Sequence, residues 1–217
     1  MGGLEGPVKA ARKALGDTLC ERLLAKGFKS ARYAEDAAAA VELAMELVPG
    51  GCTVGVPGTI TVRELGLIGK LEAQGCTIYH HWDPNLTADN KSERFIAENT
   101  ADWFITSANA MTTDGKIINI DGTGNRVAGM AWGPGKILYI VSLNKVAHDL
   151  EKAIARARDS ATPPNAARIG IHTPCTQIGH CVDCNSPERV CRVVTIMERV
   201  PLGREAHIIL TGVNLGY

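Results

Sequence analysis

The alternation of helical and strand-like patterns along the first half of the chain constrains its fold most. Apolar residues three or four positions apart predict helices, and short apolar runs rich in β-branched residues predict strands. Helices are expected at about 5–26, 37–48, 61–74 and 89–99, and strands at 52–56, 77–82 and 103–106. Thr61 and Glu64 have the spacing of a capping box, which places a helix start at Thr61. This order favours βαβ units, and therefore an α/β fold with an open, mainly parallel sheet flanked by helices.

The second half of the chain departs from this rhythm. Asp114-Gly115 between two strand-like arms predicts an inserted hairpin. A glycine-rich polar loop at 121–126 and a buried strand at 136–141 follow. A helix is then expected with Val146, Leu150, Ile154 and Ala157 on one stripe and its end at Pro163-Pro164, before two last strands at 193–197 and 206–210. With no internal repeat or linker, residues 1–217 are expected to form a single domain with an embedded cysteine-rich loop at 172–192.

Composition excludes several classes of protein. The 23 basic and 23 acidic side chains cancel, so overall charge gives no reason to expect binding to nucleic acid or an anionic membrane surface. No window approaches the length of apolar sequence needed for a membrane span. Residues 1–6 lack the basic and apolar regions of a secretory signal. We therefore expect a cytoplasmic protein.

Two segments are candidates for an anion-binding site. Gly58 and Thr59 lie in a turn between a predicted strand and helix, where backbone N–H groups can face an anion. Asn109 follows the strand at 103–106, and the later loop contains Asp121, Gly122, Gly124, Asn125 and Arg126. Sites in parallel sheets form at the carboxyl ends of strands. Arg126 could hold a carboxylate or phosphate through two hydrogen bonds, with Asp121 as a base or as the group that orients Arg126. Ordinary tight turns are the alternative interpretation.

His80 and His81 end a predicted strand. Because neighbouring strand residues point to opposite faces, at most one of them can join a given site. We expect a packing or surface role for both.

Four of the seven cysteines fall within one short segment that has no apolar periodicity. These are Cys175, Cys181, Cys184 and Cys191. In a reducing compartment such a cluster predicts metal ligands, with an iron–sulfur cluster as the first expectation and structural zinc as the alternative. Free thiols or a redox disulfide remain open, and His172 or His180 could replace one ligand. Cys20, Cys52 and Cys76 are expected to be packing residues.

Several motifs resemble the LUD-domain, or lactate-utilisation, family. They run from Ile105 to Gly115 and from Asn119 to Ala128, then through Gly133-Pro134, Asn144-Lys145-Val146 and a stretch ending at Ala166, to the cysteine segment. The resemblance implies a fold similar to the glucosamine-phosphate deaminase, ribose-phosphate isomerase and CoA-transferase group. It also implies a subunit of a system that oxidises lactate to pyruvate, with iron–sulfur partner subunits and a small anionic metabolite as ligand.

Two other functions remain open from the sequence. One is a non-catalytic assembly module with structural zinc. The other is an enzyme that resembles a phosphosugar isomerase or a CoA-transferase. Fold likeness alone is weak support for either enzyme.

Overall fold

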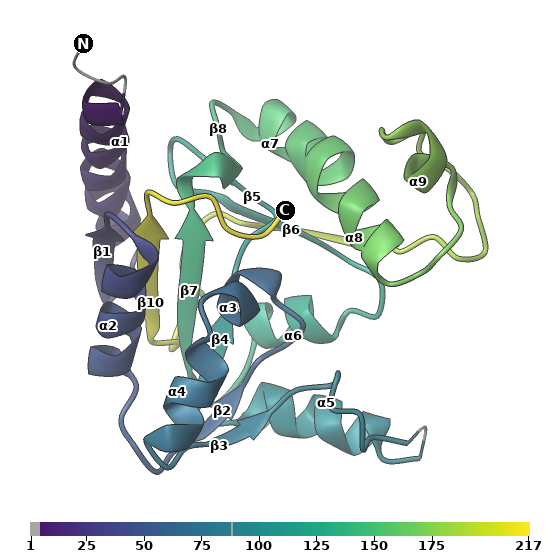
Figure 1. Cartoon of the computed structure of the whole chain (residues 1–217), viewed down its shortest axis with the longest axis horizontal. Coiled ribbons are helices and arrows are strands. Elements are labelled where there is room, and N and C mark those ends of the chain that lie inside the picture. Colours follow the sequence, from purple (N-terminus) through teal and green to yellow (C-terminus); the bar gives the residue numbers. More distant parts are fainter. Residues whose placement is uncertain (1–4, 88) are drawn as a thin grey trace.

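In the computed structural model, which describes residues 5–87 and 89–217, six strands form one wholly parallel sheet (Figure 1). Their order across the sheet is β1 (Ser30–Ala34), β10 (Ala206–Thr211), β7 (Lys136–Ser142), β4 (Trp103–Thr106), β2 (Thr53–Gly55) and β3 (Thr77–Tyr79). Every neighbouring pair is parallel. The predicted open α/β architecture is confirmed.

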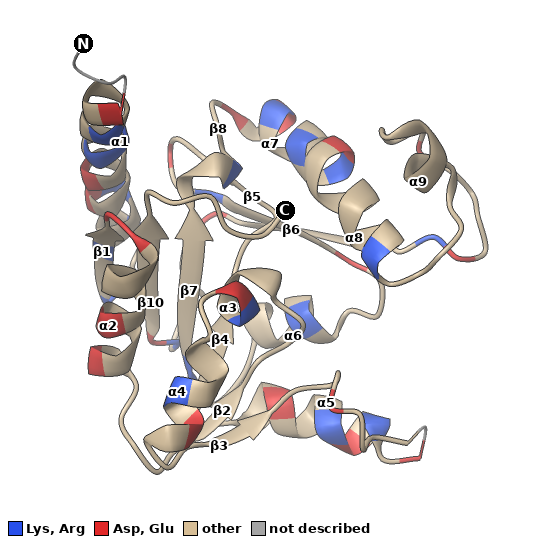
Figure 2. Cartoon of the chain, viewed as in Figure 1, with Lys and Arg blue, Asp and Glu red and all other residues tan. Residues whose placement is uncertain are grey.

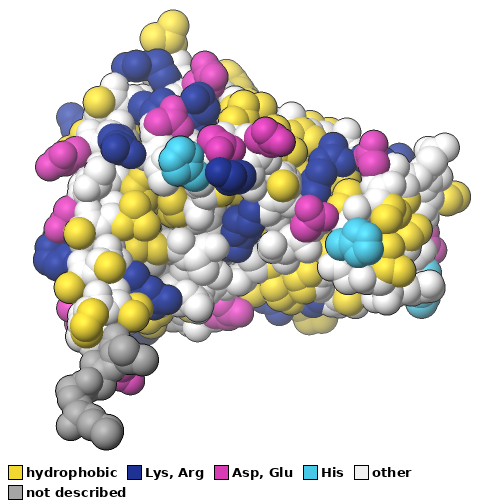
Figure 3. All heavy atoms as spheres, turned by 90° about the horizontal axis from the view of Figure 1, so that it is seen from above, with side chains coloured by type: hydrophobic (Ala, Val, Ile, Leu, Met, Phe, Trp, Pro, Cys, Tyr) yellow, Lys and Arg dark blue, Asp and Glu magenta, His cyan; other side chains and the backbone are white. Residues whose placement is uncertain are grey.

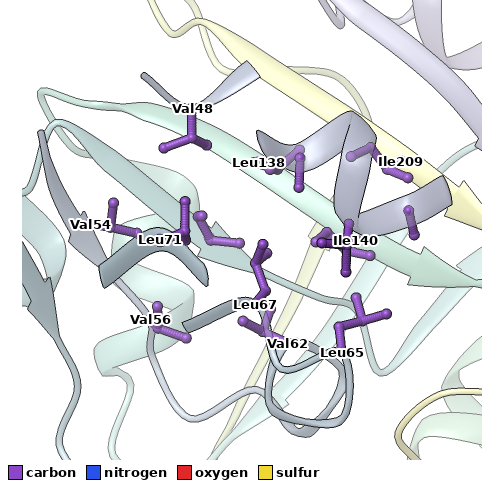
Figure 4. Close-up of a cluster of buried hydrophobic side chains, with 14 of the residues drawn as sticks. Val48, Val54, Val56, Val62, Leu65, Leu67, Leu71, Leu138, Ile140 and Ile209 are labelled. Carbon is purple, nitrogen blue, oxygen red and sulfur yellow. The ribbon is translucent and has the colours of Figure 1, made fainter. Parts of the chain in front are cut away.

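Helices cover both faces of this sheet because its strands are apolar on both sides. On one face lie α2 (Ala37–Leu47), α3 (Ile60–Glu64) and α4 (Leu67–Ala73), packed on Ile105, Leu138, Ile140 and Ile209 (Figure 4). On the other lie α1 (Glu5–Ala25) and α6 (Asn125–Ala131), packed on Phe104, Ile137, Tyr139 and Ile208. Complete burial of one such side chain stabilises the fold by about 1.5–3 kcal/mol.

A second sheet lies beside the first and contains the predicted hairpin. Its order is β8 (Val146–Ala147), β5 (Ala110–Thr112), β6 (Ile117–Asp121) and β9 (Val193–Met197). β5 and β6 are antiparallel around Asp114-Gly115, and Gly115 has the positive φ of 85° that this turn requires. One face of the second sheet packs on α7 (Leu150–Arg156), where Ala153 meets Ile118 and Ile120.

The prediction of one continuous helix from Thr61 to about residue 74 is wrong, because this segment forms two helices, α3 and α4. Gly66 lies between them in the left-handed conformation, with φ 61°. The capping box is also wrong. Thr59 occupies the N-cap position without a side-chain cap, and Thr61 lies inside α3 with its hydroxyl facing Ser107.

The helix expected at 146–163 also differs from the structure. Val146 belongs to β8, and α7 begins at Leu150 after Asp149, whose carboxylate accepts a hydrogen bond from Lys152 N. Pro163 and Pro164 do not end a helix. They lie in the first turn of α8 (Thr162–Arg168), which follows a π-helical turn at Ala157–Ala161. Proline is favoured at this position because the first-turn N–H groups have no partner within the helix.

Several elements were absent from the sequence expectations or were only partly placed. β1, α6 and α8 were not predicted, and the cysteine-rich loop contains the short helix α9 (Pro174–Ile178). α5 (Lys91–Thr100) confirms the helix expected at 89–99, with a start two residues later. α5 crosses close to β2, since a β-carbon added to Gly55 would lie 1.9 Å from the Glu98 carbonyl oxygen.

The surface carries charges of both signs. Figure 3 shows basic and acidic side chains interspersed over the face seen from above, as the balanced composition predicts. Basic positions also occur on α3, α6 and α8 around the C-terminus (Figure 2). Within the described residues, the structure has no helix that combines the length and apolar character needed to cross a membrane.

Candidate functional site

A cavity of about 330 Å³ opens at the carboxyl ends of three adjacent strands. The turn after β2 contributes Gly58 and Thr59, the residues after β4 include Ser107 and Asn109, and the turn after β7 contributes Lys145. Because β2, β4 and β7 are neighbours in the sheet, these three segments meet although they lie far apart in the sequence. This is the position at which ligands bind in open α/β sheets. The volume is sufficient for a small metabolite.

The opposite wall of the cavity comes from the end of β6, the start of α6 and the side of α8. It contains Asp121, Gly122, Asn125 and Arg126 from the predicted loop, together with Asn165 and Arg168. The structure therefore brings together seven of the eight residues predicted to bind or act on a ligand. The eighth, Gly124, does not line the cavity. It precedes α6 as its N-cap, with φ 90°, so its role is in the backbone turn.

Arg126 is the mostly buried cation of this wall, with 17% of its side chain exposed. Its Nε lies 3.4 Å from Asp121 Oδ2, and its Nη2 donates to the Ile120 carbonyl at 2.6 Å and to Asn109 Oδ1 at 3.2 Å. Burial lowers the pKa of Arg126, and Asp121 opposes that effect. A guanidinium remains charged in proteins, so Arg126 presents a fixed positive charge to the cavity.

Asp121 holds this arrangement through both carboxylate oxygens. Oδ2 faces Arg126, and Oδ1 accepts hydrogen bonds from Thr123 N at 3.1 Å and Gly124 N at 3.0 Å. Its side chain is 10% exposed. Of the two roles expected for Asp121, this geometry favours orientation of Arg126 over action as a base, because both oxygens are already engaged.

Lys145 is a cavity residue that sequence reasoning did not single out as a site residue. It is 3% exposed, and its Nζ donates to Thr61 Oγ1 at 2.8 Å and to Ser107 Oγ at 3.1 Å. Burial, with the nearby positive charges of Arg156 and Arg126, lowers its pKa to about 7, while Glu64 acts weakly in the opposite direction. The available signal was a lysine shortly after the end of an apolar strand, where a parallel sheet places its ligands.

A buried acid–imidazole pair forms another part of the cavity. His81 lines it, and His81 Nδ1 lies 2.8 Å from Oε1 of Glu98, whose side chain is completely buried. Burial raises the pKa of Glu98, and the contacts with His81 and Asn125 partly offset this. With Nδ1 directed at Glu98, the other ring nitrogen, Nε2, lies near Gly58. The expectation of a packing or surface role for His81 did not include this pairing.

The four clustered cysteines line one small cavity. Its other walls include Arg158, Thr162, Asp183 and Arg189. The sulfurs have other partners. Cys175 Sγ lies 3.2 Å from Thr173 Oγ1, Cys191 Sγ lies 3.6 Å from Thr162 Oγ1, and Asp183 N donates to Cys181 Sγ at 3.4 Å. Burial raises the pKa of Cys191.

The cysteine cavity offers the sulfur donors that a soft metal centre takes. Four thiols suit zinc or iron, and the Asp183 carboxylate at the cavity is paired with Arg158 and Arg189. The volume is about 20 Å³, room for a single ion or one water-sized occupant. Within 5–87 and 89–217, however, no three His, Cys, Asp or Glu side chains are grouped closely enough to hold a metal ion. Metal binding would therefore draw the thiols inward.

Comparisons with known proteins agree with this architecture. The family model described as the LUD domain matches residues 17–211. Among solved structures, a DUF162 family protein from Deinococcus radiodurans aligns over 93% of this chain and 98% of its own, with a TM-score of 0.51 and 14% sequence identity. At that identity the likeness concerns the fold alone. A search of curated proteins finds no match.

Proposed function

Since the chain belongs to the LUD domain family, which is associated with lactate utilisation, we propose that it binds a small carboxylate metabolite in the cavity at the strand ends. The ligand class is a 2-hydroxy acid such as lactate or the corresponding 2-oxo acid. The observation that carries the proposal is the Arg126 guanidinium, held by Asp121 and Ile120 at the cavity wall.

The charge around the cavity supports an anionic ligand. Arg63, Arg126, Lys145 and Arg168 line it, whereas Asp121 is paired with Arg126. Lys145 is positively charged in only part of the population near neutral pH, because its pKa is about 7. Nε and Nη2 of Arg126 are engaged by Asp121, Asn109 and Ile120, and Nη1 can donate a charge-assisted hydrogen bond to a ligand carboxylate. The hydroxyls of Thr61 and Ser107 can bond the 2-hydroxyl or 2-oxo group of the same ligand.

A panel of ligands tests this proposal by thermal shift. A ligand specific to the folded chain stabilises it by about 2.7 kcal/mol at a hundredfold excess over its Kd. L-lactate and pyruvate should raise the melting temperature, and acetamide, which has no carboxylate, should not. A rise with sugar phosphates alone would replace the proposal with the phosphosugar alternative.

We also propose that the four cysteines hold a metal centre. Four thiols around one cavity suit one tetrahedral ion such as zinc, and the iron–sulfur cluster stays a prediction. Such an ion would crosslink α9 to the segment before β9. No step at the carboxylate cavity depends on it.

The cysteine segment is also the best candidate for contact with partner subunits of a lactate oxidation system. Ile178 and Val182 are apolar and about half exposed on this segment. Arg158 and Arg189 line the cysteine cavity together with Val182, and both are paired with Asp183. A cysteine segment ordered by a metal ion, with apolar residues on its surface, could also dock partner subunits in the assembly-module alternative. Docking at this segment and ligand binding at the strand ends are compatible in one chain.

A further inference from the structure

Lys145 is a buried amine without a carboxylate partner in the described part of the chain. Its two hydrogen-bond acceptors are the hydroxyls of Thr61 and Ser107, at 2.8 and 3.1 Å. Buried lysines are normally paired with an acid, because an isolated ammonium is costly to remove from water. Here no salt bridge to Lys145 is formed by residues 5–87 or 89–217. The site therefore tolerates the neutral amine.

The surrounding charges also favour the neutral form of the Lys145 amine. Among the described residues, Arg156 from α7 and Arg126 from α6 are the nearby cations that oppose protonation, and Glu64 from α3 is the acid that favours it. The pKa of about 7 leaves a large fraction of neutral amine at physiological pH. A desolvated lysine beside other cations is the recognised way in which proteins obtain a nucleophilic amine.

Lys145 and Arg126 line the same cavity and are close enough to influence one another electrostatically. A 2-oxo acid has a carboxylate directly bonded to its ketone carbon. A carboxylate at Arg126 would place the adjacent electrophilic carbonyl in the cavity that Lys145 also lines. A 2-hydroxy acid in the same position offers no such carbon.

We propose that Lys145 forms a Schiff base with a small 2-oxo acid whose carboxylate is held by Arg126. The proposal rests on the carboxylate-binding function and adds a covalent step to it. The Nζ lone pair attacks the ketone carbon, an N–C bond forms and the C=O π electrons move to oxygen. Transfer of the two amine protons to that oxygen releases it as water and leaves the imine. Amine and ketone give imine and water, with no oxidation or reduction.

The hydroxyls around Lys145 supply the proton path for this step. Thr61 Oγ1 and Ser107 Oγ both contact Nζ, and they lie 3.3 Å from one another. Each hydroxyl can accept one proton while it donates another, so the pair can carry protons between the amine and the departing oxygen. The Gly216 backbone lies over the same group. A β-carbon at Gly216 would be 3.0 Å from Nζ and 2.7 Å from Thr61 Oγ1.

Reductive trapping tests the proposal directly. The full chain is incubated with pyruvate and sodium cyanoborohydride, and the modified residue is located by peptide mass mapping. We expect one stable adduct per chain, on Lys145, and none with L-lactate. Lys145→Arg should abolish the adduct, while Lys70→Arg, a change at an exposed lysine on α4, should leave it unchanged. The mapping on the unaltered chain stands even if Lys145→Arg fails to fold.

The results separate this inference from the binding proposal. If pyruvate binds in calorimetry and no adduct forms on Lys145, the Schiff base is overturned and carboxylate binding stands. Labelling spread equally over exposed lysines also overturns it. If neither pyruvate nor lactate binds, both proposals fail.

Discussion

Arg126 and Asp121 form a mostly buried ion pair, in which Arg126 Nε and Asp121 Oδ2 are 3.4 Å apart. Asp121 ends β6, and Arg126 lies in the first turn of α6. The pair is local in sequence, but it faces the carboxyl ends of β2, β4 and β7 across the cavity. Asp121 also accepts the N–H groups of Thr123 and Gly124, so the turn that begins α6 and the orientation of Arg126 depend on one carboxylate. The site is therefore preorganised without a ligand.

Gly55→Ala should destabilise the fold strongly. The new β-carbon would lie 1.9 Å from the Glu98 carbonyl oxygen, and α5 would have to move away from β2. We expect a loss of about 3 kcal/mol or more in the free energy of unfolding, measured by urea denaturation. Gly69→Ala is the matched control, since that α4 glycine has open space around it and should gain up to about 1 kcal/mol. Equal effects at the two positions would contradict the packing of α5 on β2.

Lys145→Met should change how stability depends on pH. The folded pKa of about 7 lies below the ordinary lysine pKa of 10.5, so the unfolded chain binds more protons between these values. Wild-type stability should therefore rise with pH across pH 7–10, by an amount on the order of 4 kcal/mol. The variant should lack this rise, whereas Lys70→Met should keep it. If the urea denaturation midpoints of wild type and Lys145→Met change with pH in the same way over that range, the Lys145 amine is not desolvated.

Glu98→Gln should stabilise the chain increasingly as pH rises. Burial raises the folded pKa of Glu98, so its contribution to stability is fully present at low pH and is lost as pH rises through the folded pKa. Glutamine removes the buried charge and can still accept a hydrogen bond from His81 Nδ1. The free energy of unfolding of this variant relative to wild type should increase from pH 4 to pH 7. A decrease over that range would mean that the His81 contact outweighs desolvation; Glu42→Gln, on the exposed side of α2, is the control.

The cysteine segment should contain a stoichiometric metal when the protein is purified without oxygen. We expect about one zinc per chain, and Cys184→Ser should lose it, because removal of one of four thiolates weakens a tetrahedral site. Cys20→Ser, on α1 and outside the cysteine cavity, should retain it. Elemental analysis and a visible spectrum distinguish the outcomes. Iron with sulfide would restore the cluster prediction, and absence of metal from the native chain would exclude both.

The sequence predicted the sheet, the hairpin and the Asp121–Arg126 loop because each depends on local pattern. Short apolar runs rich in β-branched residues mark the strands, and Asp114-Gly115 marks the turn. Lys145 was not predicted as a site residue for a different reason. Strand order in the sheet places the end of β7 beside that of β4, and chain order does not contain that information.

Other differences arose where tertiary contacts overruled local signals. Thr61 and Glu64 match a capping box, but the Thr61 hydroxyl bonds Lys145 and Ser107. Pro163 follows a π-helical turn and begins a new helix, which a rule that prolines end helices cannot anticipate.

Calorimetric titration of pyruvate and L-lactate into the native chain and into Arg126→Lys tests the central claim most directly. Lysine keeps the positive charge but loses the planar guanidinium that Asp121, Asn109 and Ile120 hold at the cavity wall, so we expect binding at least about tenfold weaker, equivalent to ~1.4 kcal/mol. Arg32→Lys, at an exposed arginine paired with Glu46, should bind like the native chain. Unchanged affinity in Arg126→Lys, or no binding of either acid to the native chain, would contradict the account.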